Sequence, residues 1–200
     1  MKHILALIAC CWLVVPALAQ DNLLPIDPNT NKVSYAEVVT VSGQSKAKVF
    51  GKAMKWMGTK HTEVNPYVVT YENEAEGTIT GKGSFTLPAE RRKYNVQFLV
   101  NISIKDGRYK YELTDIMIQF KTAAGASGGG FGYWSSSSYK EAEMTQYSLE
   151  TFYPARLKNK NKPVIKYFEE INRESFEAID REMRSLAGSL KETLAKDNDW

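Results

Sequence analysis

The sequence predicts an α+β fold in which two helices cover one face of a curved, five-stranded antiparallel sheet, in the order strand, helix, four strands, helix. Three observations support this prediction. Residues 94–120 alternate between apolar and polar positions on both sides of a tight turn, and shorter alternating stretches precede them. Apolar residues recur at helical spacing in residues 45–57 and again after residue 163. The 200 residues are sufficient for one domain core.

The first strand is expected at residues 33–42, which are rich in β-branched residues. The helix that follows begins at Ser45, a residue type that caps helix N-termini. Its lysines are expected to keep its outer face in water: Lys46, Lys48, Lys52, Lys55 and Lys60. A phosphate or anionic-lipid site built from these lysines is the alternative.

Two further strands are predicted at residues 67–71 and 78–87, with a turn between them. Gly81 and Gly83 lie on the same face of the second of these strands as its apolar side chains. They predict either a bend or the close packing of a helix, because glycine has no side chain to fill the space.

Residues 94–120 predict a long β-hairpin. The dipeptide Asp106-Gly107 is typical of a two-residue type I′ turn, in which both residues have a positive φ. Such a turn places Ile104 opposite Tyr109 on the apolar face of the hairpin. A β-bulge near Asp115 is then required to keep the later apolar residues of the second strand on that face.

The chain beyond the hairpin divides into two parts. Residues 122–138 are rich in glycine and serine and predict a loop that carries three large aromatic residues, Phe131, Tyr133 and Trp134. Residues 139–200 predict a connecting segment and a helix that reaches from about residue 163 to 196. Such a helix would be about 50 Å long, longer than the sheet, so that it bends or one end projects.

Residues 1–19 predict a signal peptide, because a basic start and an apolar run end in the small-residue pattern Ala17-Leu18-Ala19. Cleavage before Gln20 would leave a mature chain without cysteine and without a transmembrane segment, in the periplasm or secreted. The alternative is a lipoprotein anchored at Cys10, because Leu7-Ile8-Ala9-Cys10 is similar to a lipobox.

Four short motifs accompany this order of elements: Leu24-Pro25-Ile26-Asp27, Lys82-Gly83-Ser84-Phe85, Lys105-Asp106-Gly107-Arg108-Tyr109-Lys110-Tyr111 and Thr114-Asp115. Together they resemble a family of secreted Bacteroidota proteins of unknown function that are described as having a TATA-binding-protein-like fold. The resemblance covers residues 23–120, so residues 20–121 are expected to form the core of that fold. It implies a fold and an exported location, and it supplies no catalytic residues.

The composition argues against catalysis and against a bound cofactor or metal. The predicted mature chain has one histidine, His61, which is too few for a catalytic triad or a zinc site. Glu72, Glu74 and Glu76 alternate at a strand end, which leaves a hydrolase as the less favoured reading. The formal net charge of +3 gives no general attraction to nucleic acid.

A binding or scaffold domain is therefore the predicted class of function. The sheet face opposite the helices is expected to be rich in amides with mixed charge, and its candidate contact residues are Asn95, Gln97, Asn101 and Lys110. The aromatic residues of the 122–138 loop are candidate contacts for an envelope protein or a glycan. Self-association through the C-terminal helix is a further expectation. A small-ligand or lipid-binding protein with a cavity between sheet and helices is the alternative.

Overall fold

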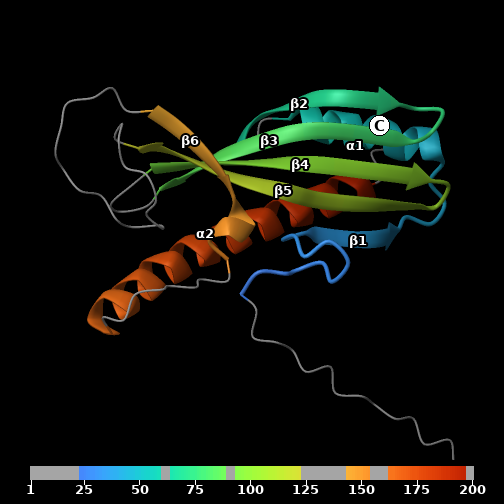
Figure 1. The fold of residues 1–200 in the computed structure, drawn as a ribbon. Coiled ribbons are helices and arrows are strands. Elements are labelled where there is room, and N and C mark those ends of the chain that lie inside the picture. The colour runs from blue at the N-terminus through green and yellow to red at the C-terminus, as the bar shows by residue number, and fades with distance from the viewer. Residues whose placement is uncertain (1–22, 60–63, 89–92, 123–142, 154–161, 197–200) are drawn as a thin grey trace, which may run out of the picture.

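The computed structural model describes residues 23–59, 64–88, 93–122, 143–153 and 162–196. These residues form a six-stranded antiparallel sheet and two α-helices (Figure 1). The elements are β1 (Tyr35–Thr40), α1 (Lys46–Gly58), β2 (Val64–Asn73), β3 (Thr78–Pro88), β4 (Lys93–Lys105), β5 (Arg108–Thr122), β6 (Glu143–Ser148), a 3-10 turn (Leu149–Thr151) and α2 (Lys162–Ala195). The predicted order is confirmed, and β6 is an additional strand.

The sheet has the strand order β1-β5-β4-β3-β2, and β6 also pairs with β5. β1 pairs with the first part of β5, up to Leu113, whereas β6 pairs with its last part, from Met117 onward. Both short strands therefore lie along the same edge of β5, one after the other. β5 has 15 residues and is therefore long enough to pair with both strands.

Both helices cover one face of the sheet, with α1 behind β2 and β3 and α2 behind β4 and β5 in the view of Figure 1. The N-terminal part of α2, drawn in orange, extends beyond the sheet. Of the two outcomes expected for a helix this long, projection is therefore the one observed.

The register of the central hairpin agrees with the prediction. Ile104 lies opposite Tyr109, and Val100 lies opposite Leu113. The register then shifts between Gln97 and Leu99, and Asp115 adopts a positive φ of 50° at the resulting bulge. The bulge keeps the apolar residues of both halves of β5 on the buried face.

The hairpin turn differs from the predicted type I′ turn. Gly107 has a φ of 71°, but Asp106 does not belong to the residues with positive φ. The turn packs against the start of α1, where the Asp106 carboxylate accepts a 2.8 Å hydrogen bond from the backbone N–H of Lys46. The backbone of Gly107 bonds to Val41 and Gln44. The turn at Asp106-Gly107 is therefore bonded to the connection between β1 and α1, and its conformation differs from the one that the dipeptide alone predicts.

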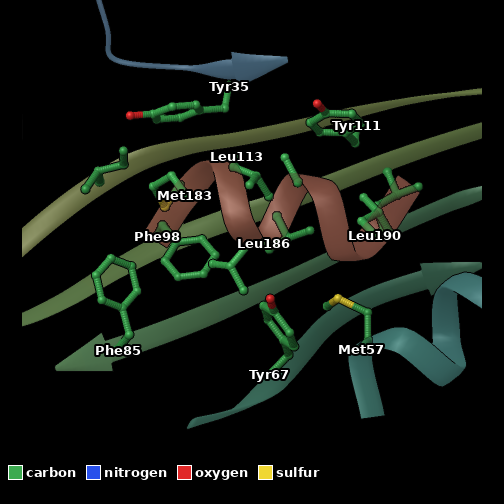
Figure 2. Packing of buried hydrophobic residues seen from close by; sticks show 14 of the residues in the cluster. Tyr35, Met57, Tyr67, Phe85, Phe98, Tyr111, Leu113, Met183, Leu186 and Leu190 are labelled. Carbon is green, nitrogen blue, oxygen red and sulfur yellow. The ribbon is translucent and has the colours of Figure 1, made fainter. Parts of the chain in front are cut away.

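The core lies between the sheet and the helices (Figure 2). A Cβ atom on Gly81 would lie 2.3 Å from Cε of Met57 in α1. A Cβ atom on Gly83 would lie 2.4 Å from the ring of Phe98 and 2.7 Å from that of Tyr67. Close packing is thus the reason for both glycines, and this packing gives no support to a ligand cavity at this position.

Helix α1 begins as predicted, because the Ser45 hydroxyl accepts a hydrogen bond from the backbone N–H of Lys48. The expectation that all its lysines face water is wrong for Lys52, whose residue surface is only 8% exposed. Its ammonium group donates to the side-chain oxygen of Gln44 at 2.6 Å and to the carbonyl oxygen of Leu194 at 3.3 Å. Lys52 therefore belongs to the contact between the two helices.

Candidate functional site

The candidate site is the face of the sheet that the helices leave uncovered, which we call the open face. Directly paired residues of antiparallel strands point to the same side, so the strand pairing identifies its members. Gln97, Asn101 and Lys110 alternate with buried core residues, as does Asn95, and all four lie on the open face. Asn95, Gln97 and Asn101 are half-buried, and Lys110 is exposed.

Four amides at one end of the open face form two hydrogen-bonded pairs. The Asn95 side-chain nitrogen donates to the Gln119 side-chain oxygen over 2.9 Å, between β4 and β5. The Gln146 amide of β6 donates to the Gln97 oxygen over 3.2 Å. These contacts tie β4, β5 and β6 together at one end of the sheet, so the amides have a structural role there.

Three exposed apolar side chains lie on the open face and were not among the residues predicted from the sequence. Val38, Val68 and Tyr71 are 61%, 63% and 47% exposed, and their partners across the strands are Lys110, Lys82 and Thr80. All three therefore point away from the helices. Leu99 and Met117 are half-buried between them, on β4 and β5.

The reason for missing Val68 and Tyr71 is the irregular pairing of β2. Its register with β3 shifts twice, once between Asn65 and Val68 and once between Val69 and Tyr71. The second shift brings Val68 and Tyr71 to the same face although they are three positions apart. Simple alternation along the sequence assigns them to opposite faces.

The charge of the open face is less mixed than expected. Among its strand residues whose side chains are described, four are cationic, Lys82, Lys105, Arg108 and Lys110, and one, Glu112, is a carboxylate. The ammonium group of Lys110 lies 4.0 Å from that carboxylate. Lys105 and Arg108 face each other directly beside the hairpin turn, a like-charge pair that is unfavourable for the sheet.

The candidate carboxylates of the hydrolase reading do not converge. Glu72, Glu74 and Glu76 are exposed around the β2–β3 turn. Glu76 serves that turn, because its carboxylate accepts from the Tyr71 hydroxyl over 3.1 Å and its backbone N–H donates to the Asn73 side chain. In the described part of the chain, no three His, Cys, Asp or Glu side chains gather in a group able to hold a metal ion. His61 lies outside the described residues, as do the loop aromatics Phe131, Tyr133 and Trp134.

Polar contacts on the opposite side hold β1 against α2. The Tyr35 hydroxyl donates to the Asp180 carboxylate at 3.0 Å, and Arg184 binds the same carboxylate while its guanidinium lies 5.8 Å from the centre of the Tyr35 ring. Burial, followed by the charge of Asp180, raises the pKa of Tyr35. These groups bind one another and connect β1 to α2, so their role is structural.

A second set of contacts connects β1 to α2 and β5 through Glu37. The Glu37 carboxylate accepts from the ammonium group of Lys191 at 2.9 Å and from the hydroxyl of Tyr111 at 3.1 Å. The hydrogen bond from Lys191 lowers the pKa of Glu37. Burial, assisted by the Glu37 carboxylate, raises the pKa of Tyr111 to about 12.

The gap between β1 and β6 along β5 is closed by side chains. Lys32 forms a 2.5 Å ion pair with Asp115 at the bulge, and this contact raises the pKa of Lys32. The Glu150 carboxylate accepts hydrogen bonds from the backbone N–H of Val33 and from the hydroxyl of Ser148. The carboxylates at this position thus have partners within the fold.

Comparison with known proteins agrees with this architecture. Residues 35–119 match the family model described as "Domain of unknown function (DUF4468) with TBP-like fold". The match confirms the resemblance inferred from the sequence motifs: residues 35–119 are similar to this family. No curated protein matches the chain.

Two solved structures share the fold. A TBP-like protein from Parabacteroides distasonis is 17% identical with a TM-score of 0.53, over 84% of this chain and 97% of that chain. A DUF4468 family protein from Bacteroides ovatus is 18% identical with a TM-score of 0.50, over 89% of this chain and 94% of that chain. At this identity the likeness concerns the fold alone. In the described residues, neither helix is apolar enough over a sufficient length to cross a membrane.

Proposed function

We propose that the protein is a non-enzymatic binding domain, exported to the periplasm or secreted, that holds a partner protein on the open face of its sheet. The single observation that carries this proposal is the placement of the exposed apolar side chains. Val38, Val68 and Tyr71 are the large apolar residues most exposed within the described chain, and all three lie on the open face.

The composition around these side chains favours a protein as the partner. Leu99 and Met117 occupy the middle of the face, and the surrounding strand positions carry hydroxyl and amide side chains. An apolar centre with a polar rim is typical of protein interfaces. The four cations against one carboxylate favour a partner surface with an excess of Asp and Glu, because complementary charges steer association.

Site-specific photo-crosslinking in the native host tests this proposal. A photoreactive phenylalanine analogue replaces Leu99 at the centre of the open face or, as a matched control, the exposed Ser185 of α2. We expect a discrete protein adduct from position 99 and none from position 185. Equal adducts from both positions, or adducts only with glycan, would contradict the proposal.

The captured partner is then purified and its affinity measured with two variants. Leu99→Glu places a carboxylate opposite Lys82, a change that the neighbouring strand accommodates, whereas Ser185→Glu alters the far side of the molecule. We expect the first variant to weaken binding by about tenfold or more, corresponding to about 1.4 kcal/mol, and the second to leave it unchanged. Retained affinity of L99E would remove the open face from the interaction.

A further inference from the structure

Among the described residues, the outer edge of β2 pairs with no other strand. β2 lies at one end of the sheet and pairs on one side with β3 (Figure 1). It has 10 residues, compared with 6 in β1 and 6 in β6, the short strands on the opposite edge. A long edge strand offers unpaired backbone groups to another strand, which proteins normally restrict.

The sequence of β2 carries almost no charged side chains, which are one of the protections against such pairing. Between Val64 and Asn73 there is no Lys or Arg, and the one acidic residue, Glu72, is next to the end. Pro66 and the first register shift lie near its start, and the second register shift leaves Thr70 as a bulge between Val69 and Tyr71. The stretch from Val68 to Tyr71 therefore presents an apolar, uncharged edge, and its two exposed apolar side chains lie on the open face.

These residues are arranged so that the strand complements a second copy of itself. The bulge at Thr70 brings Val68 and Tyr71 to the same face. If two β2 strands pair antiparallel about a two-fold axis between Val69 and Thr70, Val68 of each copy therefore lies opposite Tyr71 of the other. A β-branched residue opposite an aromatic residue is a favourable cross-strand pair. In this register Glu72 lies opposite Tyr67 of the other copy, so no like charges meet.

We propose that the protein forms a symmetric dimer through β2, in which the sheets of two copies join edge to edge. A two-fold axis perpendicular to the sheet keeps both open faces on the same side. The dimer therefore presents one continuous surface of twice the size. This edge contact leaves Leu99 and Met117 uncovered, so the dimer is independent of whether the open face binds a partner.

Sedimentation velocity of the full chain over a concentration series tests the proposal with a pair of matched variants. Val68 and Val38 are almost equally exposed, lie on the same face and each face a lysine across the strand, Lys82 and Lys110 respectively. Val68→Glu and Val38→Glu thus make the same chemical change on opposite edges of the sheet. We expect V38E to have the same dimer dissociation constant as the wild type. The dissociation constant of V68E should be higher by about tenfold or more.

A charge-complementation experiment tests the register. Tyr71→Lys places an ammonium group beside Glu76, which the local fold tolerates, and it should weaken self-association as V68E does. A mixture of V68E and Y71K proteins should form a heterodimer, because residue 68 of one copy then attracts residue 71 of the other. A monomeric wild type, a dimer that survives V68E, equal loss in V38E, or a mixture that stays monomeric would overturn the proposal.

Discussion

The ammonium group of Lys52 in α1 donates to the carbonyl oxygen of Leu194 in the last turn of α2, 142 residues further along the chain. The same carbonyl accepts a 3.1 Å hydrogen bond from the Gln44 side chain, which in turn binds Lys52. The last carbonyls of an α-helix lack partners within the helix, and a cation there interacts favourably with the helix dipole. This contact therefore joins α1, the connection before it and the end of α2.

Replacement of Lys52 by Met should destabilise the fold. The variant keeps the length of the aliphatic chain but leaves the Gln44 oxygen without a buried donor, at a cost of about 1–3 kcal/mol in the free energy of unfolding. Denaturant-induced unfolding measures this loss of stability. Lys55→Met, at an exposed position of the same helix, should change stability by no more than about 0.5 kcal/mol. Equal effects of the two variants would mean that the Lys52 contact is not stabilising.

A second prediction concerns the backbone at the β5 bulge. Asp115 has a φ of 50°, which Asp and Asn tolerate and a β-branched residue does not. Asp115→Asn removes the charge that pairs with Lys32 but retains this conformation. Asp115→Val should therefore be less stable than D115N by about 1–2 kcal/mol, as measured by thermal and chemical unfolding. Equal stability of D115V and D115N would contradict the argument that the backbone conformation at position 115 disfavours a β-branched residue.

The hairpin register was predictable because the apolar residues of β4 and β5 must share one face. That requirement alone located the bulge at Asp115. The range of α2 was predictable for a similar reason, since its apolar stripe is long and regular. By contrast, β6 is a short strand whose partner is the last part of β5, beyond the bulge, and residues 143–148 carry no strong alternation.

The candidate site was predictable in part. Alternation placed Asn95, Gln97, Asn101 and Lys110 on the open face, where the structure has them. The burial of Lys52 was not predictable, because its acceptors come from a distant segment. The apolar residues of β2 were not predictable either, since two register shifts interrupt the alternation on which such reasoning depends.

Glycine substitutions separate tight packing from helix propensity. Gly83→Ala would bring a methyl group within 3 Å of the rings of Phe98 and Tyr67, and such overpacking costs about 1–3 kcal/mol. Gly188 in α2 has open space around its Cβ position, so Gly188→Ala should stabilise the protein by about 0.5–1 kcal/mol. Differential scanning calorimetry should show a lower Tm for G83A and a higher Tm for G188A. A raised Tm in both variants would contradict the packing described at Gly83.

The contact between β1 and α2 predicts a dependence of stability on pH. Lys191, with a smaller contribution from Tyr111, lowers the pKa of the Glu37 carboxylate. A group with a lowered pKa in the folded state stabilises the protein above its unfolded pKa, and this stabilisation is lost as the pH falls through the lowered pKa. Because both side chains are partly exposed, the effect should not exceed about 1 kcal/mol.

Two variants test this dependence. Denaturant unfolding of the wild type and Glu37→Gln should differ most near neutral pH, with the wild type more stable, and the difference should vanish in acid as Glu37 takes up a proton. Lys191→Met should remove most of the same pH dependence, because Lys191 is the main cause of the lowered pKa. A difference between wild type and E37Q that stays constant from neutral to acidic pH would show that the charge of Glu37 does not hold β1 to α2.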